Sequence, residues 1–371
     1  MFNSDRNPKL FTCRSFYVLF LQGGNHIKKC TSQYFLITTL KMFLFVTNIQ
    51  NPFMKSIFCL LLLASTLFNN CYAQNDDEDL KKITVSDTIL KARNLIIPGP
   101  FNAQKALLKL FPGKYYNITK RSGYQNELIN WDIKTPDRKS YIDVNGYQGD
   151  LLFPFERGVA TRLMNVMDFK DSTGLQYKVI SFNHSEYDEE GLQTSRFTGG
   201  LLGLAKFALT KEGWKLRIFQ PAIGGYGAFS NSPTPKPVLI GEDQYAFMIE
   251  HMNGGGGGPF FSALFLIAGT NGTYQQIMSA YGVKKTTGAD EEVPTSWSSE
   301  YSVPLSKKKY FRDIIITTKG TYASSNLEGL PESVSARIKP GKKGKYSITT
   351  RYVYKGSKGY EAQVPAAIVL N

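Results

Sequence analysis

The spacing of the apolar residues changes from a helical to a two-residue period near Tyr115. Before that point, residues 84–97 have apolar positions at loosely helical spacing and end at Pro98-Gly99-Pro100. Asn102 can cap a second short helix, which Pro112-Gly113 would end. The sequence therefore predicts one or two short helices ahead of a β region.

From Tyr115 onward the chain consists of short apolar or alternating runs rich in Tyr, Phe, Ile and Val. Gly, Asn, Asp and Lys separate the runs, a pattern that is typical of strands and turns. Because the connecting segments are short, we expect antiparallel pairing, since parallel neighbours need a crossover of a dozen residues or more. The four predicted hairpins pair 128–133 with 140–144, 161–169 with 175–182, 201–209 with 214–219, and 261–268 with 274–280.

Further runs at 238–241 and 245–250, and a C-terminal pair at 310–318 and 346–354, extend the β pattern. No long low-complexity linker divides the runs. We therefore predict an all-β fold, mainly of antiparallel hairpins and with one or two short N-terminal helices, as a single β-rich domain over 74–371. A sandwich, a curled sheet and a partial propeller are all compatible with this pattern.

A short apolar segment ahead of this domain predicts export. Lys55 is followed by the apolar run 57–64, which is too short to span a membrane but has the length of a signal-peptide core. Cys71-Tyr72-Ala73 places small residues three and one before a cut at Gln74. We predict a signal peptide over 54–73 and a periplasmic or extracellular mature protein. The alternatives are an uncleaved anchor and a lipoprotein with its lipid on Cys71.

Residues 1–53 precede the predicted signal peptide, whereas a signal peptide opens a chain. We interpret this stretch as an N-terminal extension that results from a translation start assigned too far upstream. The alternative is a second membrane segment over 34–46, which Lys41 interrupts.

Cysteine and charge are both distributed unevenly about the predicted cleavage site. All the cysteines, Cys13, Cys30, Cys59 and Cys71, precede it, so the mature domain has no disulfide framework, thiolate zinc site or cysteine nucleophile. The formal net charge is +14, and residues 301–371 carry 13 basic and 4 acidic residues. For an exported protein, this basic C-terminal portion indicates an anionic envelope polymer or a lipid surface as partner, and not nucleic acid.

The basic residues of the C-terminal portion lie in two clusters, which we predict to bind anions. Their convergence would create one positive patch, whose attraction would weaken at high salt. Tyr310 and Phe311 can add apolar contact. The alternative is a solvated basic face that favours solubility. The first cluster is Lys307, Lys308, Lys309 and Arg312, and the second is Lys339, Lys342, Lys343 and Lys345.

The order of motifs over residues 175–285 resembles a group of exported bacterial proteins. The motifs are Gly-Gly-Leu-Leu-Gly-Leu at 199–204, Gly213-Trp214, and Leu-Ile-Gly-Glu-Asp-Gln-Tyr-Ala-Phe at 239–247 before a glycine run. The resemblance implies no activity. Similar proteins often have a Cys-His pair where this chain has Ser195-Arg196, so it implies no metal or thiol chemistry either.

The glycine-rich segments do not meet the requirements of a phosphate site. The run from Gly254 to Gly258 lacks the Lys-Ser/Thr pair and the helix that follow a Walker loop. Gly224-Gly225-Tyr226-Gly227 is followed by prolines where a dinucleotide-binding helix would begin. We interpret the longer run as a flexible connection or a close backbone approach, and we predict no cofactor.

The densest group of metal-ligand types is His184-Ser185-Glu186-Tyr187-Asp188-Glu189-Glu190. Calcium can use several such carboxylates, but the run lacks the glycine-punctuated spacing of a calcium loop. We interpret it as a solvated acidic turn and predict no metal site. His184 and His251 are the only histidines after the cut, and no Gly-x-Ser-x-Gly or His-Glu-x-x-His motif occurs.

These observations favour a non-enzymatic binding or structural protein of the envelope or periplasm. The alternative is an envelope glycan hydrolase, because its paired carboxylates can come from distant strands. Two buried carboxylates about 5 to 9 Å apart in a cleft would favour the hydrolase, and a shallow aromatic face the binder. Ligand and oligomeric state are left open. The aromatic residues expected to be exposed are Tyr115, Tyr116, Tyr124, Tyr141, Tyr147 and Trp297.

Overall fold

The computed structural model describes residues 95–117, 127–133, 138–146, 151–188, 191–192, 194, 196–270 and 272–371. All of them belong to the unit Gln74–Asn371. The predicted signal peptide, its cleavage site, the N-terminal extension and most of the first predicted helix lie outside the described residues. Within these ranges, no helix has the length and apolarity needed to cross a membrane.

The helix predicted after Asn102 is present as α4 (Ala103–Leu110). The Asn102 side chain accepts a hydrogen bond of 2.8 Å from the backbone N–H of Lys105 and so satisfies a donor of the first turn. Leu107 and Leu110 are buried on one face of the helix, at the spacing expected for an amphipathic helix. The cap and the apolar stripe together explain why this short segment is helical.

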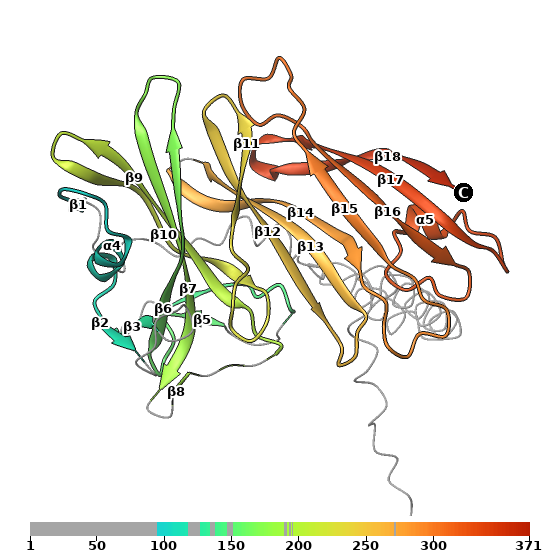
Figure 1. Cartoon of the computed structure of the whole chain (residues 1–371), viewed down its shortest axis with the longest axis horizontal. Helices are drawn as coiled ribbons and strands as arrows, with labels where there is room; N and C mark the ends of the chain where they lie inside the picture. Colours follow the sequence, from blue (N-terminus) through green and yellow to red (C-terminus); the bar gives the residue numbers. More distant parts are fainter. Residues whose placement is uncertain are drawn as a thin grey trace, which may run out of the picture. The chain divides into compact units, whose positions relative to one another are not determined.

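The first sheet has eight strands in the order β1-β10-β9-β7-β6-β3-β2, with β8 paired to β7. Figure 1 shows these strands in cyan to light green. All their pairings are antiparallel. The strands are β1 (Ile96–Ile97), β2 (Lys114–Asn117), β3 (Glu127–Trp131), β6 (Val159–Lys170), β7 (Gln176–Asp188), β8 (Gly191–Leu192), β9 (Gly200–Thr210) and β10 (Gly213–Tyr226).

The second sheet also has eight strands, and they follow one another in chain order from β11 to β18. β4 (Lys139–Ser140) and β5 (Leu152–Phe153) form a separate two-stranded sheet. The structure is therefore all-β and antiparallel, as predicted. The strands of the second sheet are β11 (Lys236–Gly241), β12 (Gln244–Gly254), β13 (Phe260–Thr270), β14 (Thr273–Lys285), β15 (Trp297–Ser302), β16 (Ile314–Ala323), β17 (Lys343–Tyr354) and β18 (Tyr360–Leu370).

Three of the four predicted hairpins are confirmed as the antiparallel pairs β6 with β7, β9 with β10, and β13 with β14. The hairpin predicted for 128–133 and 140–144 is wrong, because β3 pairs with β2 and β6 while β4 pairs with β5. The side chains of β3 are mostly buried, whereas those of β4 are exposed. Apolar burial therefore draws β3 into the first sheet and leaves β4 outside it.

Two smaller expectations also need correction. The end of the predicted helix over 84–97 is extended, because Ile96 and Ile97 pair with β10 and form the edge strand β1. In the C-terminal pair, β16 begins at Ile314 and not at residue 310. Phe311 has a φ of 50°, in the left-handed region, which interrupts the extended backbone before the strand.

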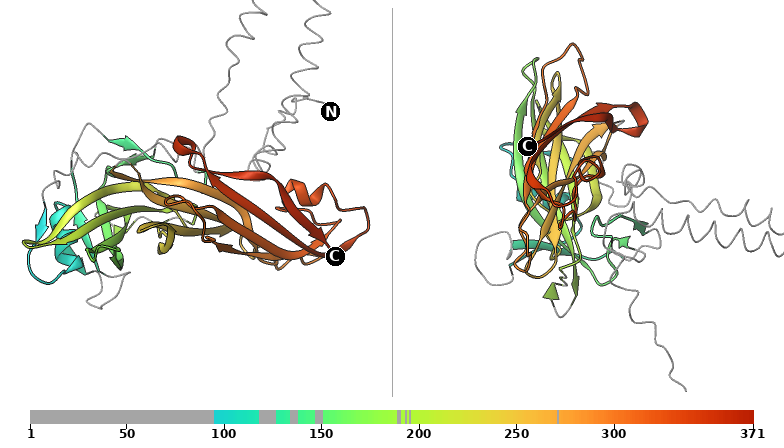
Figure 2. Two further views of the ribbon diagram at one scale, coloured as in Figure 1. Left: turned by 90° about the horizontal axis from the view of Figure 1, so that it is seen from above. Right: turned by 90° about the vertical axis from the view of Figure 1, so that its right-hand side faces the viewer.

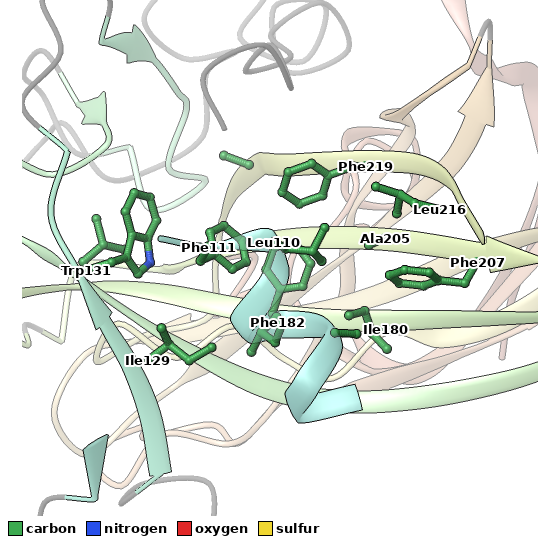
Figure 3. Close-up of a cluster of buried hydrophobic side chains, with 14 of the residues drawn as sticks. Leu110, Phe111, Ile129, Trp131, Ile180, Phe182, Ala205, Phe207, Leu216 and Phe219 are labelled. Carbon is green, nitrogen blue, oxygen red and sulfur yellow. The ribbon is translucent and has the colours of Figure 1, made fainter. Parts of the chain in front are cut away.

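An aromatic core lies between α4 and one face of the first sheet (Figure 3). Phe111, directly after α4, packs against Trp131, Phe182 and Phe219 at ring-centroid distances of 5.3, 5.2 and 5.7 Å. All four side chains are buried. Burying one such ring stabilises the fold by about 1.5 to 3 kcal/mol relative to leaving it exposed.

A second core joins the two sheets. Leu202 and Leu204 of β9 belong to the same buried cluster as Phe247 of β12 and Phe265 of β13. Because strand side chains alternate between faces, β9 contributes to this core with one set of residues and to the aromatic core with the other. The first sheet is therefore covered by apolar groups on both faces.

The second sheet curls, so that strands from both of its ends share a core. Met248 of β12 and Ile277 of β14 lie in one cluster with Ile316 of β16 and Tyr360 of β18. Gly359, with a φ of 70°, brings the start of β18 against β14, where an added Cβ would lie only 2.3 Å from the carbonyl oxygen of Ile277. Figure 2 shows the curl of the second sheet. The short helix α5 (Glu332–Ser335) lies at the end of this sheet opposite Gly359.

Candidate functional site

A pocket of about 530 Å³ lies at one end of the curled second sheet. This volume is within the usual range of ligand pockets, roughly 300 to 1,000 Å³. Its walls come from four places in the sequence: the start of β12, the end of β13 with the start of β14, residues 310–311 before β16, and the end of β17 with the β17–β18 turn. The curl brings these segments together, and no short motif of the sequence contains them.

One wall of the pocket is aromatic. The rings of Phe311 and Tyr354 are stacked, with centroids 3.8 Å apart and planes at 7°. Tyr360 packs edge-on against Tyr354, and its hydroxyl donates a 2.7 Å hydrogen bond to the carbonyl oxygen of Arg312. Tyr310, which is 52% exposed, continues this wall toward solvent. The stack and the hydroxyl contact hold the rings in place.

The other walls carry neutral polar groups. The amide oxygen of Gln244 accepts a 2.9 Å hydrogen bond from the backbone N–H of Phe311, and so fixes that residue in its left-handed conformation. The amide nitrogen of Gln275 donates to the hydroxyl of Thr270. Ser357, in the β17–β18 turn, adds a hydroxyl group to the pocket lining. None of the described residues that line the pocket is Asp, Glu, His or Cys.

The first predicted basic cluster lies beside this pocket, because Tyr310 and Phe311 stand between its residues in the sequence. The Lys309 ammonium nitrogen lies 5.5 Å from the centroid of the Tyr310 ring and 3.6 Å from a carboxylate oxygen of Glu242. Glu242, and to a smaller extent Tyr310, raise the pKa of Lys309. Lys309 is therefore a cation at the rim of the pocket.

Lys308 is more firmly engaged than Lys309. Its ammonium lies 2.6 Å from one carboxylate oxygen of Asp313, while Arg351 pairs with the other oxygen. Burial alone would raise the pKa of Asp313, but the hydrogen bonds from Lys308 and Arg351 hold that pKa below its ordinary value. The side chain of Asp313 is only 8% exposed, so the three groups form a structural charge network.

The second basic cluster, Lys339 to Lys345, lies at the opposite end of the β16–β17 hairpin. Lys343 pairs with Ala323 at the end of β16, whereas Ile314 at its start pairs with Tyr352. A strand advances about 3.3 Å per residue, so the two clusters are separated by roughly 30 Å. They do not converge into one patch, and anion binding by either of them stays a prediction.

The prediction of a solvated turn is wrong for residues 184–188, which belong to strand β7, and His184 is buried among the rings of the aromatic core. Its Nε2 lies 2.9 Å from the carbonyl oxygen of Pro221, which can only accept, so Nε2 carries the hydrogen. Nδ1 then accepts from the Thr161 hydroxyl at 2.6 Å, and that oxygen accepts from Trp131 Nε1 at 2.7 Å. Burial lowers the pKa of His184 to about 3.

His251 also has a structural position. Its Nδ1 accepts a 2.9 Å hydrogen bond from the backbone N–H of Gly227, and burial lowers its pKa to about 4. Neither His184 nor His251 lines the pocket. Within the part of the chain that the structure describes, no group of three or more His, Cys, Asp and Glu residues is placed to hold a metal.

The carboxylate pair of a glycan hydrolase is not found at the pocket. Among the described residues, the buried carboxylates are Asp143 and Asp313. Burial raises the pKa of Asp143, which accepts hydrogen bonds from the backbone and side chain of Asn145 and from the backbone of Gly199. Asp313 is held by its two cations. Neither carboxylate lines the pocket.

The glycine run at the end of β12 includes a close backbone approach, because an added Cβ at Gly254 would lie only 2.3 Å from the carbonyl oxygen of Pro259. Arg196 donates to the carbonyl oxygens of Gly254 and Gly255, and its guanidinium lies 5.9 Å from the centroid of the Phe260 ring. These carbonyls face a cation, which is the reverse of what a phosphate site requires.

The aromatic residues expected at the surface divide into three groups. Tyr115 and Tyr116 are exposed, whereas Tyr141 and Trp297 are buried. Tyr124 and Tyr147 lie outside the described residues. Trp297 is buried because it packs with Val334 of α5 and Tyr346 of β17, a contact that spans distant parts of the sequence.

The neutral residues of the pocket were missed by reasoning from the sequence. Gln244 lies in the quoted segment 239–247 but was assigned no role in binding there, and Gln275 and Tyr354 belong to no quoted motif. Only Tyr310 and Phe311 were noted for binding, as apolar companions of the basic cluster. No protein-family model, no curated protein and no solved structure matches this chain. The function of the pocket therefore has to be inferred from its own chemistry.

Proposed function

We propose that this protein is an exported, non-enzymatic binding protein whose pocket holds a saccharide. The observation that carries this proposal is the combination of a stacked aromatic wall with neutral amide and hydroxyl groups around about 530 Å³. A sugar ring has apolar C–H faces that pack on aromatic rings, and hydroxyls that exchange hydrogen bonds with amides. The pocket offers both kinds of contact.

Binding without cleavage is favoured by the lining of the pocket. Hydrolysis of a glycosidic bond requires one carboxyl group as acid and another as base or nucleophile. The described lining residues include no carboxylate, and Asp143 and Asp313 are both engaged elsewhere. The hydrolase alternative therefore has no catalytic pair at this site.

The proposed location is the periplasm or the cell exterior, after cleavage near Ala73 and Gln74. The support is the apolar run 57–64 with its small-residue cleavage pattern, and the absence of cysteine from residues 74–371. In this compartment an envelope polysaccharide is an accessible ligand. The second basic cluster, Lys339 to Lys345, lies outside the pocket, so it would attract only an anionic envelope polymer long enough to extend to it, or a lipid surface.

The test is calorimetric titration of the purified protein with a panel of neutral and acidic oligosaccharides. Tyr310→Ala removes an exposed ring from the pocket wall, so we expect roughly ten-fold weaker binding or more, as loss of a buried aromatic contact implies. Tyr116→Ala is the matched control, because Tyr116 is 46% exposed and lies on the first sheet.

Three results would contradict the proposal. The first is that no oligosaccharide of the panel binds. The second is that Tyr310→Ala and Tyr116→Ala weaken binding equally, which would place the ligand elsewhere. The third is the release of new reducing ends from the bound saccharide, which would show cleavage.

A further inference from the structure

We propose that the saccharide is a uronic acid oligosaccharide, and that its carboxylate takes the place of Glu242 beside Lys309. This inference rests on the proposed saccharide binding at the same pocket. It is carried by three observations: the position of Lys309 at the rim, the weakness of its present ion pair, and the distribution of charge around the pocket.

The position of Lys309 is defined by its backbone and by the ring next to it. The carbonyl oxygen of Lys309 accepts a 2.6 Å hydrogen bond from the backbone N–H of Glu242, and the backbone N–H of Arg312 donates to Ile240 at 2.6 Å. The segment is therefore held along β11. Since the ammonium lies 5.5 Å from the centroid of the Tyr310 ring, it can reach an acidic group on a sugar that packs on that ring.

The ion pair between Lys309 and Glu242 is easily exchanged. Its two side chains are 62% and 55% exposed, and their charged atoms are 3.6 Å apart. Exposed pairs of this kind contribute little to stability. Lys308, by contrast, is bound to a carboxylate that is 8% exposed, so it is not available in the same way. The group that a ligand would displace from Lys309 is itself a carboxylate, which favours a uronic acid.

The charge around the pocket has the matching sign. No acidic residue of the described chain lines the pocket. Arg312 follows the lining residue Phe311, and Lys355 precedes the lining residue Gly356. Asp243, which precedes the lining residue Gln244, accepts hydrogen bonds from the backbone and hydroxyl of Ser172. That carboxylate is therefore engaged, and Lys309 is the cation placed to contact a ligand on Tyr310.

The experiment compares galacturonate and alginate oligosaccharides with their methyl esters, which keep the sugar and remove the charge. Each is titrated into the purified wild-type protein and into Lys309→Gln, Glu242→Gln and Lys343→Gln. Lys343 is the matched control, because it is an exposed lysine of the second basic cluster at the far end of the hairpin.

We expect the acids to bind about ten-fold more tightly than their esters. Lys309→Gln should remove this difference, and Glu242→Gln should tighten binding of the acids a few-fold because the competing carboxylate is gone. Neither change should affect the esters by more than about two-fold. Lys343→Gln should leave binding of the acids unchanged within about two-fold, because a charge roughly 30 Å away is screened.

The inference is overturned if acids and esters bind equally well, or if Glu242→Gln weakens the acids. It is also overturned if Lys343→Gln costs as much affinity as Lys309→Gln, since the attraction would then be diffuse. These results differ from failure of the proposed function, in which neither acids nor esters bind in a way that depends on Tyr310. Far-ultraviolet circular dichroism of each variant confirms that it is folded.

Discussion

His184 and Gln275 both lie on long strands and are hydrogen-bonded to a threonine, but only His184 is closed off from solvent. The imidazole of His184 has a partner at each nitrogen, and Thr161 is bonded on both sides. Gln275 donates to Thr270, and both remain partly exposed at the pocket. The difference teaches that the closed assembly is part of the core of the first sheet, while the open one leaves polar groups facing the pocket.

The largest expected loss of stability comes from removing a phenylalanine beside His184, and we compare it with removal of a phenylalanine from the pocket wall. Phe111→Ala leaves a cavity among four aromatic contacts and should lower the free energy of unfolding by about 3 to 5 kcal/mol. Phe311→Ala acts on a partly exposed ring and should cost about 1 to 2 kcal/mol. Urea denaturation of both variants measures the difference, and equal losses would show that the pocket wall is as much a part of the core as Phe111.

The local features of the fold were predictable because their signals are contiguous in the sequence. Asn102 and the apolar spacing after it mark α4, and the short polar turns between long apolar runs mark β6–β7, β9–β10 and β13–β14. The pairing of β3 was not predictable in this way. β3 pairs with the strand beside which its side chains become buried. That strand is β6, which follows the exposed strand β4 in the sequence.

The candidate site was predictable only in part, for the same reason. Tyr310, Phe311 and Lys309 are neighbours in the sequence, so the charged and aromatic character of that segment is visible there. Its combination with Gln244 and Tyr354 requires the curl of the second sheet, which depends on contacts between strands far apart in the chain. The buried role of His184 was hidden because the acidic residues after it suggest a solvated turn.

Removing the threonine hydroxyl from each assembly tests the comparison between His184 and Gln275, because Thr→Val changes the side-chain volume little. Thr161→Val leaves Trp131 Nε1–H without its acceptor and His184 Nδ1 without its donor, inside the aromatic core. Because buried polar groups without partners are costly, we expect a loss of about 2 to 3 kcal/mol in the free energy of unfolding. Thr270→Val should cost less than about 0.5 kcal/mol, because Gln275 can bond to water instead. Similar losses at the two positions would contradict the distinction between closed and open assemblies.

The smallest of the three main losses of stability is the one that His184 causes as the pH falls. Its pKa is about 3 in the folded protein, against about 6.5 in an unfolded chain, so the unfolded state binds the proton more readily. The contribution of His184 is therefore fully present above pH 6.5 and is lost as the pH falls toward 3. At roughly 1.4 kcal/mol per pH unit, the loss at pH 5 is about 2 kcal/mol.

The measurement is urea denaturation of the wild type and of His184→Gln at pH 7 and pH 5. Glutamine has a donor and an acceptor but does not titrate, so the wild type should lose about 2 kcal/mol more than the variant between the two pH values. Parallel losses would show that His184 is not held neutral in the core. None of the described residues that line the pocket is Asp, Glu or His, so binding of the methyl-esterified oligosaccharides should stay unchanged from pH 7 to pH 5 as long as the protein is folded. A change in that affinity would show that a titrating group lies at the pocket. The pocket would then share the pH dependence that we assign to the His184 assembly alone.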